Sequence, residues 1–230
     1  MPLAAHALTT LASVQEVVGT AIDTDRIERA IMAVSEAFAK YTGRELHYGA
    51  NVAEFLAGNG QEDLYLRRRA IVSVSSVYIN SDAQTVATLD GSLLPGALVM
   101  ETVYRSSTLD ALGILKRFGR WPISCGVWGD LTGQPNLSDR GTNIRVVYSG
   151  GYVTPQQATD GAGTRTLPYD LEEACIREVT GRLVRPTGNL VRERTPGGWD
   201  QTWANGSAGS VNGFGPDTAA VLDSYRLGWF

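Results

Sequence analysis

Cysteine and histidine are scarce in this chain of 230 residues, which holds two of each. Cys125 and Cys175 do not form a CxxC pair, and neither His6 nor His47 has a cysteine or carboxylate at metal-ligand spacing. The histidines also lie on opposite sides of a predicted break between elements. The sequence therefore predicts no disulfide framework, no metal centre and no cofactor. Two idle thiols are expected in a protein made in a reducing cytoplasm.

Long apolar runs and a basic excess are absent too. No segment approaches the roughly 20 apolar residues that span a bilayer, so we expect no membrane partner. Residues 1–18 lack the basic start of a secretory signal. The net charge of -4 argues against a free-standing nucleic-acid binder. It is compatible with a wall that surrounds DNA without gripping it, because acidic groups repel phosphates.

Signatures of catalysis are absent as well. The chain has no G-x-S-x-G nucleophile elbow and no P-loop. Gly161 and Gly163 lack the third glycine and the preceding strand of a dinucleotide fingerprint. No pair among the 24 acidic residues stands out as a glycosidase pair. We therefore expect a protein that is not an enzyme.

What the chain does contain is helical periodicity at both ends. Residues 10–18 predict a short helix capped by Thr10, with an apolar face that includes Val17. Residues 24–42 repeat apolar side chains at three- and four-residue steps and end at Gly43, which predicts a long amphipathic helix. Asp25 and Glu28 there have capping-box spacing.

Helical patterns return near the C-terminus. A helix is predicted to begin around Pro168 and to continue to Pro186 with one apolar face. A last helix is predicted from Asp217, as its cap, to about Tyr225. Between them, residues 187–215 are expected to form a glycine-rich loop.

The middle of the chain has a period of two instead. Strands are predicted around residues 64–66, 71–79, 98–104 and 144–148, and turns over 130–141. With 43% apolar and 19% charged residues, the chain is expected to bury a real core. The predicted fold class is α+β, a small helical bundle with an inserted antiparallel β-rich region. Bundle helices occupy residues 1–45, the insertion 46–152, and the remaining helices with the glycine-rich loop and an aromatic tail 153–230.

Three consecutive arginines, Arg67, Arg68 and Arg69, are candidates for contacts with a neighbouring subunit or with DNA in a lumen. They are equally explained as charges that keep an exposed strand edge soluble. In a strand, Arg67 and Arg69 point one way and Arg68 the other, so all three cannot serve one surface.

Tryptophans in a glycine-rich segment also point to a partner. Trp199 and Trp203 either fold back on their own domain or become ordered on another subunit, and we favour the subunit because tryptophan is a preferred interface anchor. The C-terminal segment has the same character and is expected to fill a groove on another protein. It consists of Tyr225, Arg226, Leu227, Gly228, Trp229 and Phe230.

The order of several segments resembles the head–tail connector (adaptor) proteins of tailed bacteriophages. The segments are LTTLASV (8–14), DTD (23–25), YTGR (41–44), LRRRAIVSVSSV (66–77), VVYSGGY (146–152), LPYDLEEA (167–174) and LDSYR (222–226). Each is short, and their order carries the resemblance. Residues 81–143 are long for the family, and residues 227–230 extend past its usual end.

The resemblance implies a structural virion protein in the phage neck, assembled in the host cytoplasm. Such a protein forms a homo-oligomeric ring of about twelve subunits between the portal and the stopper or tail-completion protein. Genomic DNA passes through the lumen without sequence-specific binding. The portal is then the partner expected for Tyr225, Arg226, Leu227, Trp229 and Phe230.

A β-rich carbohydrate-binding module of a phage or bacterial surface protein is the alternative. Trp121, Trp128, Trp199 and Trp203 would then be platforms on which sugar rings stack. The amphipathic helices at both ends are poorly explained by that function. A hydrolase ranks third.

Overall fold

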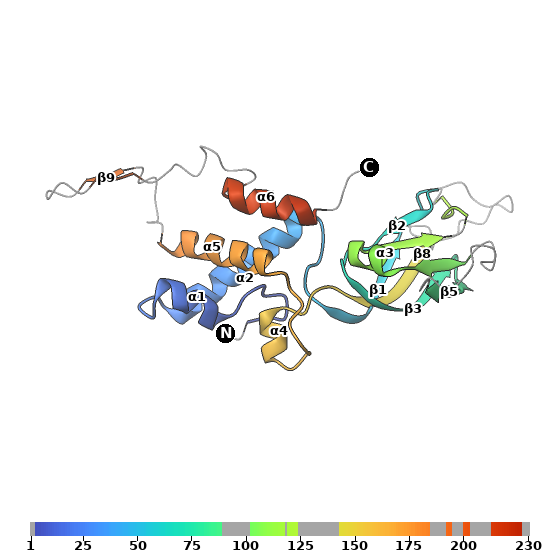
Figure 1. The fold of residues 1–230 in the computed structure, drawn as a ribbon, viewed down its shortest axis with the longest axis horizontal. Coiled ribbons are helices and arrows are strands. Elements are labelled where there is room, and N and C mark those ends of the chain that lie inside the picture. The colour runs from blue at the N-terminus through green and yellow to red at the C-terminus, as the bar shows by residue number, and fades with distance from the viewer. Residues whose placement is uncertain are drawn as a thin grey trace, which may run out of the picture. The chain divides into compact units, whose positions relative to one another are not determined.

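The computed structural model describes residues 3–88, 102–117, 119–123, 143–184, 192–194, 200–202 and 213–226. The chain divides into two compact units, one made of Met1–His47 with Val153–Phe230 and the other of Tyr48–Tyr152. Helices form most of the first unit and strands most of the second (Figure 1). The predicted fold class is confirmed: α+β, with a helical bundle and an inserted, mainly antiparallel β-rich region.

The helices of the described residues are α1 (Leu11–Val18), α2 (Thr24–Thr42), α3 (Ser107–Leu112), α4 (Pro155–Thr159), α5 (Tyr169–Val184) and α6 (Pro216–Tyr225). The strands are β1 (Gly49–Leu56), β2 (Asp63–Tyr65), β3 (Ile71–Ile79), β4 (Asp82–Gln84), β5 (Val86–Thr88), β6 (Val103–Arg105), β7 (Ile114–Arg117), β8 (Ile144–Gly150), β9 (Arg192–Arg194) and β10 (Asp200–Thr202).

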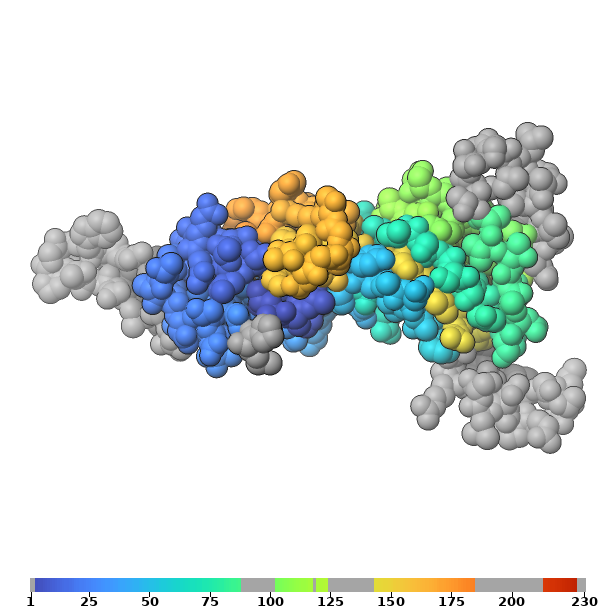
Figure 2. All heavy atoms as spheres, turned by 90° about the horizontal axis from the view of Figure 1, so that it is seen from below, coloured from blue at the N-terminus to red at the C-terminus, as the bar shows by residue number. Residues whose placement is uncertain are grey.

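The helical unit joins the two ends of the chain. Helix α5 packs against α1, α2 and α6, so segments far apart in sequence share one core. Figure 2 shows blue N-terminal atoms directly beside orange atoms of the segment after residue 153. On α2, Ile27, Ile31, Val34 and Phe38 are buried, as the three- and four-residue repeat predicted.

The ends of α1 and α2 follow the predicted signals in part. Thr10 accepts a hydrogen bond from the Ser13 backbone N–H at 3.2 Å, and Gly43 adopts the left-handed conformation that ends α2. The capping-box prediction was wrong, because the N-cap of α2 is Asp23, two residues before Asp25, and it makes no side-chain cap bond. The apolar face predicted for α1 was also wrong at Val17, which is 59% exposed.

Helix α5 keeps the predicted apolar face, whereas α6 differs from the prediction at its start. Leu171, Ala174, Cys175, Val179 and Leu183 of α5 are all buried. Gly215 is the N-cap of α6, so the prediction that Asp217 caps this helix was wrong. The stretch predicted as loop contains β9 and β10, which pair antiparallel, and a buried Phe214 whose ring packs edge-on against Phe38 at 5.3 Å.

The Cys175 thiol is fully buried in this unit, and burial raises its pKa to about 12. Because the folded-state pKa lies above that of an unfolded thiol, this group stabilises the fold below about pH 9, and the stabilisation is lost as the pH rises towards 12.

Cys175 should therefore be nearly inert in the native protein. In a Cys125→Ser variant at pH 8, we expect a thiol reagent to label it about a thousandfold more slowly than an unfolded cysteine, because three pKa units reduce the thiolate fraction by that factor. Labelling kinetics with and without denaturant measure this ratio. Full labelling of the native protein within minutes would contradict the burial.

In the described part of the β unit, the strands form two four-stranded sheets. One has the strand order β1-β8-β3-β4 and is antiparallel throughout, and the other has the order β2-β7-β6-β5. Among the strand pairs of the described residues, the antiparallel prediction fails for β5 and β6, which pair in parallel. The buried core takes side chains from both sheets, among them Leu64, Leu115, Val146, Tyr148 and Trp121. The predicted strand at 98–104 is represented by β6, and residues 98–101 and 130–141 lie outside the described residues.

Candidate interaction surfaces

The three arginines lie in a bend between β2 and β3 rather than in a strand. The backbone N–H of Arg67 donates to both carboxylate oxygens of Glu54 at 3.2 Å, and that of Arg68 donates to the Tyr148 hydroxyl at 3.2 Å. The alternation considered for a strand therefore does not apply to these three side chains. The bend is held by two side chains that come from β1 and β8.

Glu54 and Tyr148 form a buried pair behind the bend. The Tyr148 hydroxyl donates to Glu54 Oε2 at 2.6 Å. Burial, followed by the hydrogen bond and charge of Glu54, raises the pKa of Tyr148 well above its usual value, so the phenol stays protonated and remains a donor. Neither residue was predicted from sequence, because their role depends on a contact between positions 94 apart.

The three arginine side chains have different environments. The Arg67 side chain is 70% exposed, with its Nε 3.7 Å from Glu54 Oε1. Arg68 is buried, and Arg69 Nε donates to the Ala111 carbonyl at 3.1 Å, next to the end of α3. Of the three, Arg67 is the one whose side chain is mainly presented to solvent.

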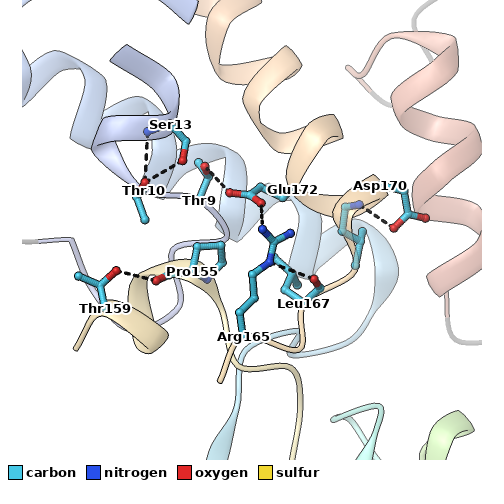
Figure 3. Close-up of polar contacts among 10 residues, drawn as sticks. Thr9, Thr10, Ser13, Pro155, Thr159, Arg165, Leu167, Asp170 and Glu172 are labelled. Atoms are coloured by element: carbon cyan, nitrogen blue, oxygen red, sulfur yellow. Dashed lines mark hydrogen bonds and ion pairs between the residues drawn. The ribbon is translucent and has the colours of Figure 1, made fainter. Parts of the chain in front are cut away.

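A polar network joins the N-terminal segment, the loop before α5 and α5 itself (Figure 3). Glu172 accepts a hydrogen bond from Thr9 Oγ1 at 3.3 Å and forms an ion pair with Arg165 Nη1 at 2.7 Å. Arg165 Nε also donates to the Leu167 carbonyl at 3.3 Å, and its guanidinium lies 4.0 Å from the centre of the Tyr169 ring. The network fixes one wall of a surface groove.

That groove, of about 530 Å³, runs between α1 and α5. Two of its lining side chains are large and exposed, Val17 at 59% and Tyr169 at 79%. Such a concave surface with apolar groups left in water is typical of a site that a partner covers. Its charges are mixed, with Glu16 and Glu173 beside Arg177.

The C-terminal segment is anchored at its first two residues. The Tyr225 hydroxyl donates to the Asp170 carboxylate at 2.9 and 3.0 Å, and the Arg226 guanidinium lies 5.7 Å from the centre of the Tyr41 ring. Both residues therefore contact their own unit. The other candidates, Leu227, Trp229, Phe230, Trp199 and Trp203, lie outside the residues whose side chains are described.

The two histidines lie side by side, contrary to the sequence-based separation. Their ring centres are 6.0 Å apart, and His6 Nε2 is 3.7 Å from Glu36 Oε1. Three or more metal-ligating side chains in a suitable cluster are not found within the described ranges. The same ranges contain no helix long and apolar enough to cross a bilayer.

Trp121 does not provide a stacking platform for sugars. It is 1% exposed, and its indole Nε1 donates to the Glu62 carbonyl at 2.8 Å. This burial removes one of the four tryptophans on which the carbohydrate-binding alternative rested. Trp128, Trp199 and Trp203 lie outside the described side chains.

Comparison with known proteins gives similarity only at the level of solved structures. No family model matches the chain, and no curated protein matches it. A chain from the neck of an empty gene transfer agent (GTA) particle, computed with C6 symmetry, has a TM-score of 0.47 and 13% identity, covering 98% of this chain and 92% of that one. A chain from the virion of a native GTA particle gives the same four values.

A third similar chain comes from the neck of a native GTA particle computed with C12 symmetry. Its TM-score is 0.43 at 14% identity, with coverage of 100% of this chain and 94% of that chain.

Proposed function

We propose that this protein is a structural virion protein of the neck, a head–tail connector that forms a homo-oligomeric ring between the portal and the stopper or tail. In this function the genome passes through the lumen, and the protein performs no catalysis. The ordered sequence segments that resemble connector proteins support the proposal. The net charge of -4 suits a lumen that does not retain DNA.

The observation that carries the proposal is the exposure of large apolar side chains on both units. Val17 and Tyr169 are exposed on the helical unit, and Phe55, Val72 and Ile123 on the β unit. Scattered exposed apolar groups are common, but here two of them line one groove. Repeated head-to-tail contacts in a closed ring would cover such surfaces on every copy.

The proposed contact with the portal uses the aromatic C-terminal segment. Tyr225 and Arg226 hold the end of α6 on Asp170 and Tyr41, so the residues that follow start from a fixed point. We assign the docking itself to Leu227, Trp229 and Phe230, because aromatic side chains are frequent anchors in binding pockets. Tyr225 and Arg226 then act as the anchor of this segment.

Deletion of residues 227–230 tests this assignment. We expect the variant to keep the melting temperature of the full chain and to bind the cognate portal at least about 100-fold more weakly, the loss typical of removing two aromatic anchors. Pull-down and electron microscopy of mixtures with purified portal measure the binding.

A matched control keeps the segment and changes an exposed charge elsewhere, for which Arg29→Glu on α2 is suitable. This control should bind the portal as the original chain does. Unchanged portal binding by the deletion variant would refute docking through the tail. Absence of rings in the full-length protein, alone and with portal, would refute the connector function itself.

A further inference from the structure

A single arginine stands between two aromatic rings on the outer face of the sheet β1-β8-β3-β4. Arg145 of β8 is the register partner of Phe55 on β1 and of Tyr78 on β3. Its neighbours in sequence, Ile144 and Val146, are buried, whereas Arg145 is exposed. Because side chains alternate along a strand, this row of three residues lies on the face turned away from the core.

The guanidinium of Arg145 makes a cation–π contact with a ring on each side. Its central carbon lies 5.9 Å from the centre of the Phe55 ring and 5.6 Å from that of Tyr78. Phe55 remains 59% exposed. We call Phe55, Arg145 and Tyr78 the arginine–aromatic row.

Within the part of the chain that the structure describes, Arg145 has no ion pair and no hydrogen bond through its side chain. Arg105, by contrast, forms a bidentate ion pair with Asp110, with hydrogen bonds of 2.8 and 3.0 Å. Ring contacts of this kind orient a guanidinium and leave its N–H groups available to bind a planar anion. The row is therefore pre-organised for a carboxylate or a phosphate.

The surroundings of the row favour a protein over a nucleic acid. The adjacent row on the same face, Ala53, Val147 and Ser76, is uncharged. A nucleic acid bound through its backbone needs several cations, because each neutralised phosphate contributes separately. One arginine with apolar and aromatic neighbours is instead the composition of a protein–protein contact.

We propose that the arginine–aromatic row is a contact surface for a second copy of this chain, with Arg145 bound to a carboxylate of that copy. The inference rests on the proposed ring and names one of its contacts. Charge complementarity supports the second copy as the occupant: the chain has 24 acidic against 20 basic residues, so another copy presents an excess of carboxylates. Covering Phe55 would at the same time remove its ring from water.

This surface differs from the one suggested by the sequence. Among the three consecutive arginines, Arg68 is buried and Arg69 binds a carbonyl of its own unit. Arg145 is isolated in sequence, and only the pairing of β8 with both neighbours brings two rings to its sides. The signal available in the sequence was one charged residue at an outward position of an otherwise apolar strand.

The test compares the assembly of Arg145→Glu with that of the original chain by mass photometry over a range of concentrations, alone and with portal. We expect the concentration for half-assembly to rise about 30-fold or more, as for loss of an interface hot spot. The melting temperature of the unassembled protein should not change, because the side chain is exposed. Phe55→Ser should weaken assembly in the same direction, and Arg29→Glu should leave it unaltered.

Each outcome has a defined meaning. If the original chain forms rings and Arg145→Glu forms them equally well, the row is not a subunit contact, and the connector function stands. If double-stranded DNA binds the original chain and Arg145→Glu abolishes that binding without affecting rings, the row binds nucleic acid and the proposal is overturned. If the original chain forms no ring under any condition, both the connector function and this contact fail.

Discussion

Replacing Trp121 by alanine is expected to lower the free energy of unfolding of the β unit by about 3 to 5 kcal/mol. The indole is almost completely buried in the core shared by both sheets. Its Nε1–H and its backbone N–H donate to the carbonyls of Glu62 and Gln61, each at 2.8 Å. Truncation therefore creates a large cavity and leaves the Glu62 carbonyl without this donor.

Urea unfolding followed by circular dichroism measures the change. Ile123→Ala is the matched control, because Ile123 follows two residues later and is 66% exposed, and it should cost less than about 0.5 kcal/mol. Equal urea midpoints for the two variants would show that Trp121 is not a core residue. Trp121 would then again be a candidate platform for sugar rings.

The helices were the part of the fold most open to prediction. Helix α2 was located from its apolar repeat and from Gly43, since both signals are local. Errors at helix starts have a local cause as well: Asp23, Asp25 and Asp217 are all acceptable near an N-terminus, and the sequence does not say which of several neighbouring residues leaves the helical conformation first.

The sequence predicted that the middle of the chain forms strands, but it did not predict which strands pair with each other. Alternating β-branched residues located β3 and β8, but pairing partners are set by contacts distant in sequence. The parallel pair β5–β6 and the burial of Trp121 follow from such pairing. The proximity of His6 and His47 has the same origin, because the segment before α1 and the segment after α2 meet in the helical unit.

The candidate interaction surfaces were the part of the protein least predictable from sequence. Arg67, Arg68 and Arg69 were predicted as candidate contact residues because they are consecutive. The backbone of Arg67 and Arg68 is held by Glu54 and Tyr148, which lie 13 and 80 residues away in sequence and on paired strands. In the described residues, the backbone N–H groups of Arg67 and Arg68 are held by side chains of their own unit, whereas the Arg145 side chain makes only its two ring contacts.

Replacing Arg165 by alanine should destabilise the helical unit by about 3 kcal/mol, through the ion pair with Glu172. The Glu172 side chain is only 10% exposed, and among the described residues its polar contact besides Arg165 is the longer hydrogen bond from Thr9. Without the guanidinium, a carboxylate remains in a poorly hydrated position. Loss of stacking on Tyr169 adds a smaller cost of about 0.5 kcal/mol at this exposed ring.

Arg177→Ala provides the control on the same groove. Its pairs with Glu173 and Asp217 are longer, at 3.8 and 3.7 Å, and all three side chains are at least half exposed, so its loss should cost below about 1 kcal/mol. Thermal and chemical unfolding of both variants measure the difference, and equal losses would contradict a buried role for Glu172.

A double variant distinguishes the cost of an unpaired Glu172 carboxylate from the cost of losing the other contacts of Arg165. If the cost of Arg165→Ala comes from an uncompensated carboxylate, combining Arg165→Met with Glu172→Met should recover most of the stability, because an apolar pair of similar size needs no counter-charge. If the cost persists in the double variant, the groove wall depends on the bonds of Arg165 to the Leu167 carbonyl and on its stacking with Tyr169. In the first case the groove between α1 and α5 keeps its shape without charge, so its assembly contacts can be tested by mutation independently of stability.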